Sequence, residues 1–342
     1  MLIHFRVNSL LAQMLNIYFC NRTFVHVAVT GATGFIGTHL CKELLKKGFK
    51  VTGIARSSGQ HAIWKELNSL GEFHRARCDI AKEDNNDLIE LFRAIEPVDA
   101  VFHLAGQAYR RGLLEASFYF RNNFFGTLNM LECCRIFKIH RFIFSSSYAV
   151  YGLGANQNIP EYLPVDESYV VKPFDFYGSS KYLAEQICKF YHERFGIESC
   201  ILRYSKVYGP GLREGIVYQA IHQALSEVPI EVYGDISTDF VYVKDVVRAT
   251  IISLERWPGG YETYNIGSGQ ESTLHYVVSK IIELAKSHSE LRFHKEPKAR
   301  LWLDISKARR GFCYNPTPME ESLTDYINYV KDISRRSSTI DS

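Results

Sequence analysis

A tyrosine and a lysine four positions apart, Tyr177 and Lys181, are the residues of this 342-residue chain whose types and spacing best fit a chemical step. In a helix, side chains at positions i and i+4 lie on one face, about one turn apart. An ammonium held beside a phenol favours the phenolate, so we expect the pKa of the tyrosine to fall from about 10 toward working pH. Such a pair can carry a proton to or from the oxygen of an alcohol or ketone.

A run of serines precedes this pair and strengthens the interpretation. Ser145-Ser146-Ser147 follows the strand-like segment Phe142-Ile143-Phe144, and the hydroxyl of Ser147 could bind the same substrate oxygen as the phenol. A second pair with the same spacing, Tyr276 and Lys280, has no serine run upstream and is interpreted as ordinary helix surface. The candidate catalytic residues are therefore Ser147, Tyr177 and Lys181.

Near the N-terminus, a glycine-rich turn joins a short strand to a helix. The strand is expected over residues 25–29 and the helix over residues 38–47, with Thr30-Gly31-Ala32-Thr33-Gly34-Phe35-Ile36-Gly37 between them. The three glycines suit a tight turn, a close approach to a pyrophosphate and close helix–strand packing, in that order. The sequence therefore predicts a dinucleotide site, with contacts expected from Gly31, Gly34, Phe35, Ile36 and Gly37. An oxidised nicotinamide bound there would favour the Tyr177 phenolate together with Lys181, and the expected fall in the tyrosine pKa rests on both.

The second expected strand, over residues 50–54, ends in Ala55-Arg56-Ser57-Ser58. Sites that prefer NAD usually place an acidic residue here for the ribose 2′-hydroxyl, whereas an arginine accommodates a 2′-phosphate. Arg56 and Ser57 therefore favour NADP(H) over NAD(H). The alternative is that Arg56 stacks on the adenine or points into water.

Strand-like and helical segments then alternate along the chain. Strands are expected at 73–78, 100–104 and 141–144, and helices near 85–95 and 123–137. This alternation predicts an α/β fold with a doubly wound parallel sheet, whose ligands bind at the carboxyl ends of the strands. The further cofactor contacts expected at that edge are Asp79, Ile80, Leu104, Ala105 and Gly106.

Over about residues 25–332 the chain resembles the extended short-chain dehydrogenase/reductases, in particular the nucleotide-sugar epimerase/dehydratase family. The matching motifs are the glycine turn, His103 to Gly106, Asn123 to Thr127, Ser145 to Gly152, Tyr177 to Lys181, Leu202 to Gly211, Ile230 to Gly234, Asp239 to Val246 and Asp304 to Ala308. The resemblance implies a Rossmann domain that binds NAD(P) and a smaller, discontinuous C-terminal part that binds a nucleoside-diphosphate sugar. It implies Tyr177 as the acid/base, Lys181 as its partner and Ser147 as the hydroxyl at the sugar oxygen. It places Asn123, Tyr204 and Val207 on the cofactor side.

The residues that depart from the family pattern reduce the number of reactions that fit this chain. Family members that act as 4,6-dehydratases carry Asp-Glu where Tyr148-Ala149 stand here, and neither side chain can replace that acid and base, so dehydration is disfavoured. Lys206 stands in place of the usual Asn, and Thr238 in place of the usual Arg; in the family both positions ordinarily face the sugar diphosphate. Our hypothesis is that Lys206 supplies the positive charge lost at Thr238; the alternative is that Lys206 faces solvent. The other candidate substrate contacts are Arg213 and Arg300, and the aromatic residues Tyr109, Tyr148 and Tyr233, for which structural packing is the alternative.

Two reactions fit the same three catalytic residues. A 4-ketoreductase would reduce a nucleoside-diphosphate 4-keto-6-deoxy sugar with NADPH, and Arg56 places this reading slightly ahead. A nucleotide-sugar 4-epimerase would oxidise C4 and return the hydride to the other face, and the sequence Ser-Ser-Ser-x-x-Val-Tyr-Gly looks most like the epimerases. A non-catalytic NADPH-binding sensor or subunit is disfavoured because Tyr177 and Lys181 are intact.

The resemblance also organises the chain into parts. Residues 24–204 and 239–268 are expected to form the NAD(P)-binding domain, and residues 205–238 and 269–335 the nucleotide-sugar-binding domain. Residues 1–23 are expected to be a poorly ordered extension. The helices near 123–137 and 179–195 would pair across a homodimer interface if this chain follows the family.

Composition sets the remaining limits. The chain is 46% hydrophobic and 23% charged, and its 40 basic and 37 acidic residues leave a net charge of +3, so a nucleic-acid partner is not expected. No apolar run approaches the roughly 20 residues of a membrane-spanning helix. The 8 cysteines are scattered without a Cys-x-x-Cys pair, which favours buried thiols of a cytoplasmic protein over disulfides or a metal site.

Overall fold

The computed structural model describes residues 25–56, 61–109, 115–152 and 160–338. The expected N-terminal extension over residues 1–23 and the predicted cofactor contact Ser57 lie outside these described residues. No helix in the described ranges is long and apolar enough to cross a membrane. The seven described cysteines are free thiols, and six of them are buried.

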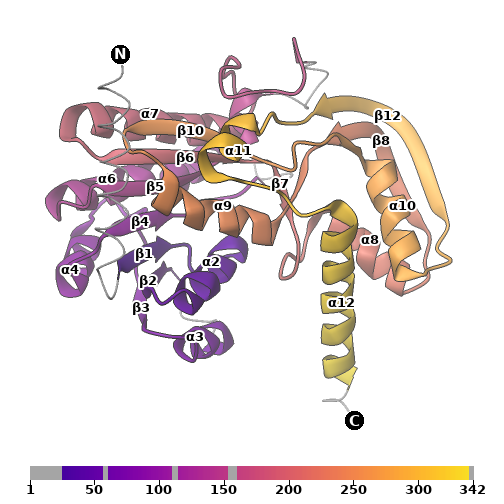
Figure 1. Ribbon diagram of the computed structural model, residues 1–342, viewed down its shortest axis with the longest axis horizontal. Helices are drawn as coiled ribbons and strands as arrows, with labels where there is room; N and C mark the ends of the chain where they lie inside the picture. Colours follow the sequence, from indigo (N-terminus) through magenta and orange to yellow (C-terminus); the bar gives the residue numbers. More distant parts are fainter. Residues whose placement is uncertain (1–24, 57–60, 110–114, 153–159, 339–342) are drawn as a thin grey trace, which may run out of the picture.

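A seven-stranded sheet forms the centre of the larger part, in the order β10-β6-β5-β4-β1-β2-β3, and all its neighbouring strands run parallel (Figure 1). Its strands are β1 (His26–Thr30), β2 (Lys50–Ala55), β3 (Phe73–Arg77), β4 (Ala100–His103), β5 (Arg141–Ser147), β6 (Glu198–Tyr204) and β10 (Tyr261–Ile266). The chain runs from β1 outward to β3 and then returns to β4 on the other side of β1. This reversal between β1 and β4 is the point where doubly wound sheets bind ligands.

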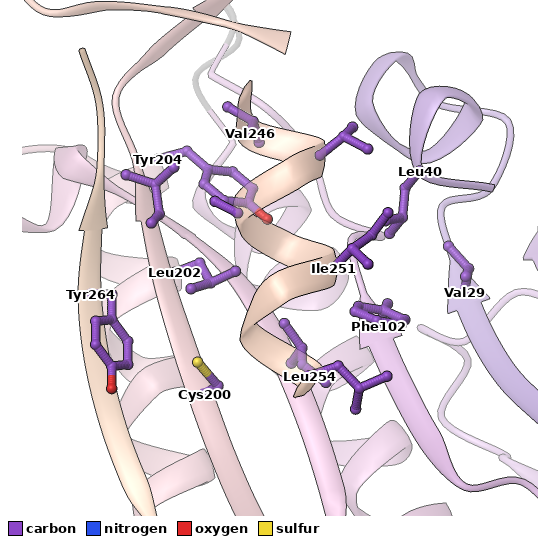
Figure 2. Packing of buried hydrophobic residues seen from close by; sticks show 14 of the residues in the cluster. Val29, Leu40, Phe102, Cys200, Leu202, Tyr204, Val246, Ile251, Leu254 and Tyr264 are labelled. Atoms are coloured by element: carbon purple, nitrogen blue, oxygen red, sulfur yellow. The ribbon is translucent and has the colours of Figure 1, made fainter. Parts of the chain in front are cut away.

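Helices cover both faces of this sheet, so its strands are apolar on both sides. One face carries α2 (Phe35–Lys46), α3 (His61–Asn68), α9 (Val243–Arg256) and α11 (Ser306–Phe312); the other carries α4 (Asn86–Ile95), α6 (Gly126–Ile136) and α7 (Phe176–Phe195). Figure 2 shows Ile251 and Leu254 of α9 packed over the sheet. Alternate residues of one strand serve the two cores: Leu202 faces α9, whereas Ile201 faces α7. The predicted doubly wound parallel sheet is confirmed.

Three short elements lie at the carboxyl edge of the sheet. After β4 the chain forms one α-helical turn, α5 (Ala116–Tyr119), and then a π-helix, η1 (Phe120–Phe125), that runs directly into α6. After β5 it forms a 3-10 turn, η2 (Tyr148–Tyr151). Because π-helical turns often occur at functional sites, η1 indicates that a functional site lies at this edge of the sheet.

The smaller part of the molecule lies beyond the β7–β9 pair, at the right of Figure 1. Its three-stranded sheet is β11 (Ser272–Thr273), β8 (Ile230–Thr238) and β12 (Leu291–Leu301), packed with α8 (Gly215–Leu225), α10 (Leu274–Ala285) and α12 (Met319–Ser338). Strands β7 (Lys206–Tyr208) and β9 (Phe240–Tyr242) form a separate parallel pair. The smaller part is thus built from separate stretches of the chain, as expected. One helix departs from the expected division of the chain. Helix α11 lies within residues 269–335, which were expected in the smaller part, but it packs on the seven-stranded sheet.

Candidate active site

The three candidate catalytic residues meet at the carboxyl edge of β5. Ser147 is the last residue of β5, and Tyr177 lies in the first turn of α7. The side chain of Asp175 caps α7 by accepting a hydrogen bond from the Gly178 N–H at 2.7 Å, which fixes where the helix begins. The Ser147 hydroxyl lies close enough to the Tyr177 phenol to lower its pKa. The structure therefore brings together a hydroxyl and a phenol that lie thirty positions apart in the sequence.

Lys181 lies one helical turn after Tyr177 and is 5% exposed. Its Nζ donates a hydrogen bond to the Ser145 carbonyl oxygen at 2.8 Å and lies 5.0 Å from the centroid of the Phe144 ring. Burial lowers the pKa of Lys181 to about 8, because the charged form loses its solvation. The ammonium is thus anchored to the same strand that ends in Ser147.

The expected fall in the pKa of Tyr177 is not produced by the protein's own groups. Burial raises the pKa of this phenol, and the nearby Ser147 hydroxyl only partly opposes the effect. The rings of Tyr109 and Tyr119 lie 6.4 and 6.2 Å from the Tyr177 ring and add apolar surface around it. The expectation also counted the oxidised nicotinamide, so it stays a prediction for the protein with its cofactor bound.

A loop after β4 is locked against this site by Asn123. The Asn123 amide donates to the Gln107 carbonyl oxygen at 3.1 Å and to Ser180 Oγ at 2.8 Å, and its Oδ1 accepts from the Gln107 N–H. A Cβ on Gly106 would lie 2.7 Å from Asn123 Oδ1 and 3.3 Å from Lys181 Nζ. Asn123 therefore ties the loop, the π-helix and α7 together beside Lys181.

The glycine turn after β1 fits a dinucleotide. Gly31 has φ +70°, and a Cβ on Gly37 would lie 2.1 Å from the Gly31 carbonyl oxygen, so neither position tolerates a side chain. The first turn of α2 carries no acidic residue, which leaves its free N–H groups for an anion. The groove beside this turn is lined by Thr30, Gly31, Thr33, Gly34, Ile54, Ala55, Arg56, Cys78, Asp79, Ile80, Ala81, Leu104, Ala105, Gly106 and Asn122. Eight of the predicted cofactor residues are among them.

At the outer end of this groove, Arg56 is held by the π-helix. Its Nη1 donates to Asn122 Oδ1 at 2.9 Å, and Asn122 in turn donates to the Phe118 carbonyl oxygen at 2.8 Å. The arginine is exposed, but its side chain is tied to the π-helix. Part of its hydrogen-bonding capacity is already used by the protein.

Several predicted cofactor residues point away from the groove. The Tyr204 phenol is buried against α9 and hydrogen-bonds the Thr250 hydroxyl, so only its backbone faces the carboxyl edge. The side chains of Phe35, Ile36 and Val207 pack against the hydrophobic cores. Successive side chains of a β-strand point to opposite faces of the sheet. A residue of a cofactor motif can therefore have its backbone near the ligand while its side chain points into the core.

Two predicted substrate residues lie at the catalytic group. Tyr109 is 57% exposed next to Tyr177. Tyr148 follows Ser147 directly, and burial raises the pKa of its phenol to about 12, so it stays a neutral hydrogen-bond donor.

Lys206 is half-buried on β7 with its Nζ 5.5 Å from the centroid of the Phe240 ring, and burial lowers its pKa. Lys206 is therefore only partly exposed to solvent, and its contact with substrate stays a prediction.

The other predicted substrate residues are less favourably placed. Arg300 is bound through its Nε and Nη2 to the carboxylate of Glu271, at 2.8 and 2.9 Å, so its charge is already compensated. Tyr233 is exposed and stacks on His294, with ring centroids 4.4 Å apart. Arg213 is exposed in the loop after β7. The Arg300 hypothesis is weakened because the guanidinium is already paired with Glu271, a partner that sequence position does not reveal.

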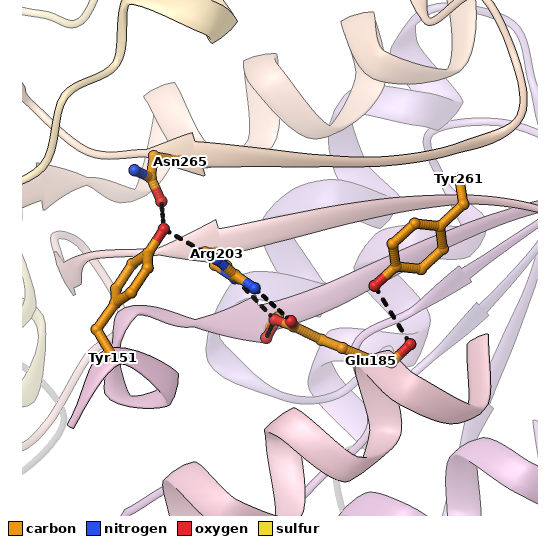
Figure 3. A network of polar contacts seen from close by, with 6 residues as sticks. Tyr151, Glu185, Arg203, Tyr261 and Asn265 are labelled. Carbon is orange, nitrogen blue, oxygen red and sulfur yellow. Dashed lines mark hydrogen bonds and ion pairs between the residues drawn. The ribbon is translucent and has the colours of Figure 1, made fainter. Parts of the chain in front are cut away.

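Behind the catalytic residues lies a buried polar network that the sequence analysis missed (Figure 3). Arg203 of β6 donates to both carboxylate oxygens of Glu185, at 3.0 and 2.6 Å, and to the Tyr151 phenol at 3.0 Å. Tyr151 donates to Asn265 of β10 at 2.7 Å, and Glu185 also accepts from Ser146 at 2.5 Å. Glu185 lies four residues after Lys181, so helical spacing could have identified it.

The second Tyr-x-x-x-Lys pair is a surface feature, as expected. Tyr276 is 45% exposed on α10, and Lys280 forms ion pairs with Glu283 and Glu320, each at 3.0 Å. This pair lies in the smaller part, on a helix distant in the fold from the edge of β5. It provides a natural control for the pair at the site.

A doubly wound sheet with a dinucleotide groove and a joined Ser, Tyr and Lys defines an extended short-chain dehydrogenase/reductase. The pattern of the NAD dependent epimerase/dehydratase family matches residues 27–267, so the chain belongs to that family. Among curated relatives, the uncharacterized UDP-glucose epimerase YtcB of Bacillus subtilis is 33% identical over 90% of this chain and 98% of its own length. The UDP-glucuronate 4-epimerase of Thermodesulfobacterium geofontis is 31% identical over 89% and 95%. A solved UDP-glucuronic acid 4-epimerase from Bacillus cereus, in complex with UDP-glucuronic acid and NAD, matches with a TM-score of 0.79 at 30% identity, covering 90% of this chain and all of that one.

Proposed function

We propose that this protein is an NAD-dependent 4-epimerase of a UDP-sugar. The observation that carries the proposal is the convergence of Ser147, Tyr177 and Lys181 at the edge of a dinucleotide groove. Several relatives that match over about nine-tenths of the chain carry the names of UDP-sugar epimerases, which favours the epimerase over the 4-ketoreductase that the sequence placed slightly ahead. The same comparisons favour NAD over the expected NADP.

The protein's residues fit such a cofactor. The acid-free first turn of α2 would hold the pyrophosphate, and Ala105 and Gly106 would lie along the nicotinamide half of the groove. Arg56 is already bonded to Asn122, so we assign it to the adenosine end and not to a 2′-phosphate. When bound, NAD supplies a hydride acceptor that returns the same hydride to C4.

The catalytic residues would manage the proton that accompanies this exchange. Tyr177 takes the proton of the sugar O4 as C4 is oxidised and gives it back as C4 is reduced. Lys181 in its charged form stabilises the phenolate, which matters because burial alone raises the pKa of Tyr177. Ser147 donates a hydrogen bond to the same oxygen. The sugar ring must present both faces of C4 in turn, whereas the protein groups stay in place.

The test is an assay of purified protein with UDP-sugars and no added cofactor. We expect conversion of substrate to its 4-epimer, and we expect Tyr177→Phe to reduce kcat by about 10²–10⁴-fold because the proton carrier is removed. Tyr276→Phe, on the exposed pair, is the matched control and should retain parental kcat. Stoichiometric consumption of added NADPH without epimer formation would instead establish a reductase.

A further inference from the structure

Lys206 emerges at the catalytic edge of the sheet. Tyr204 of β6 is in register with Ser147 of β5, and Lys206 follows two residues later as the first residue of β7. Its backbone N–H donates to the Asp239 carbonyl oxygen at 3.1 Å, and it is in register with Phe240 of β9. The lysine therefore leaves the strand next to the one that ends in the catalytic serine.

The Lys206 ammonium lacks a protein counter-ion within the described ranges. It makes no hydrogen bond or ion pair with another described side chain, and its Nζ lies against the Phe240 ring. The nearby Asp239 carboxylate does not serve it, because that carboxylate accepts hydrogen bonds from the N–H groups of Ser268, Gly269 and Leu303. The other cations at this edge differ: Lys181 is bonded to a carbonyl oxygen, and Arg203 is bonded to Glu185.

A desolvated cation without a partner is unfavourable in the free protein. An anionic group of the substrate would recover that cost on binding, as a charge-assisted hydrogen bond. The Arg that the family carries at the Thr238 position is absent here, so the charge at Lys206 is not duplicated by that neighbour. The site is therefore built to receive negative charge at this point.

The position favours an anion on the sugar. Under the proposed function, C4 of the hexose lies at Ser147 and Tyr177, and the ring carbon next to C4 is C5, which bears the C6 group. The diphosphate is attached at C1, across the ring from C4. A cation one strand away from Ser147 is therefore better placed for the C6 group than for the diphosphate.

We propose that Lys206 binds a carboxylate at C6 and makes this protein selective for a UDP-hexuronic acid. The proposal rests on the proposed 4-epimerase function and specifies its substrate class. The relatives do not decide this point, since both UDP-glucose and UDP-glucuronate epimerases are among them.

The experiment compares two substrates across three proteins. UDP-glucuronate carries the carboxylate and UDP-glucose does not, while both carry the same diphosphate. In Lys206→Met we expect kcat/KM for UDP-glucuronate to fall by about 30- to 1000-fold, mainly through KM, with a change below about threefold for UDP-glucose. Lys244→Met is the matched control, because Lys244 Nζ also lies over an aromatic ring, 5.7 Å from the Tyr242 centroid, but is exposed and paired with Asp325.

A thermal-shift measurement gives a readout that does not depend on turnover. Lys206→Met should raise Tm in the absence of ligand, because it removes an uncompensated charge. Saturating UDP-glucuronate should stabilise the parent protein more than UDP-glucose does, and this difference should vanish in Lys206→Met.

The outcomes separate this inference from the proposed function. Equal losses of kcat/KM on both substrates would assign Lys206 to the diphosphate and overturn the inference. Unchanged kinetics in Lys206→Met, or a parent protein that epimerises UDP-glucose but not UDP-glucuronate, would overturn it too, with the epimerase intact. Absence of 4-epimer from every UDP-sugar would instead overturn the proposed function.

Discussion

At the scale of single residues, the burial of Lys181 lowers the free energy of unfolding. The lysine is buried at 5% exposure, and its pKa is lowered to about 8 from its usual 10.5. Below pH 8 the lysine is charged in both the folded and unfolded states, and the full burial penalty opposes folding. Above pH 10.5 it is neutral in both states, and the penalty is gone.

We therefore predict that Lys181→Met is more stable than the parent at pH 7. A depression of this size corresponds to about 3 kcal/mol, less the lost hydrogen bond to the Ser145 carbonyl. The advantage of the variant should shrink as pH rises from 8 to 10.5, because the folded parent then binds fewer protons than its unfolded chain. Urea unfolding of both proteins at several pH values measures this difference. A constant difference across that range would contradict the assignment of the penalty to Lys181.

The catalytic residues could be read from the sequence, and their electrostatics could not. The spacing of Tyr177 and Lys181 and the serine run identified the groups that the structure joins. The effect of burial on the Tyr177 pKa could not be predicted, because desolvation depends on what packs around the phenol, including Tyr109 and Tyr119. Neither contact follows from local sequence.

At the scale of elements, α7 is held against the sheet by the Glu185–Arg203 pair. The two side chains are 0% and 6% exposed, and they join α7 to β6 and, through Tyr151, to η2 (Figure 3). Because Tyr177 and Lys181 lie on the same helix as Glu185, this pair positions both. It acts on catalysis only through those residues.

Breaking the pair should therefore be costly. We predict that Glu185→Gln destabilises the protein by about 3–5 kcal/mol, since it leaves the Arg203 guanidinium buried without its carboxylate. Glu193→Gln, at an exposed ion pair with Lys189 on the same helix, should change stability by less than about 1 kcal/mol. Denaturant titration provides both values. The double variant Glu185→Leu with Arg203→Met should recover much of the loss; if it is as unstable as Glu185→Gln, the uncompensated charge is not the cause.

Most elements were predictable, but their ends and irregularities were not. The helix expected to open with Tyr177 begins one residue earlier, at Phe176, because the Asp175 side chain caps it. The helix expected over residues 123–137 is split between η1 and α6, since a π-turn brings Asn122 and Asn123 into the buried edge. Hydrophobic periodicity detects a helix but not one widened turn within it.

At the scale of the whole molecule, apolar side chains gather on the outer surface of α7. Phe176, Leu183 and Phe190 recur every seven residues and are 49%, 42% and 52% exposed. Phe125, the last residue of η1, and Ile136, the last residue of α6, are 51% and 42% exposed. A stripe of this kind on neighbouring helices is typical of an interface. We propose that the expected homodimer forms through α6 and α7.

This proposal predicts that Phe190→Glu is a monomer. A charge at the centre of the stripe would be buried without a partner in the dimer and would prevent association. Sedimentation equilibrium or light scattering should give the mass of one chain for the variant and of two for the parent. Val228→Glu, at a residue of similar exposure in the smaller part, is the control and should stay dimeric. A parent protein that is itself monomeric would refute the proposal.

The buried carboxylate of Asp239 lies where the chain connects the two parts of the molecule. The chain passes between the two parts near residues 239, 268 and 303, and the Asp239 carboxylate accepts N–H hydrogen bonds from Ser268, Gly269 and Leu303 at 2.6, 3.1 and 3.3 Å. The buried Asp239 side chain thus holds together the three chain segments that connect the two parts. These three hydrogen bonds favour a fixed orientation of the connecting segments, and with them of the two parts, around Asp239.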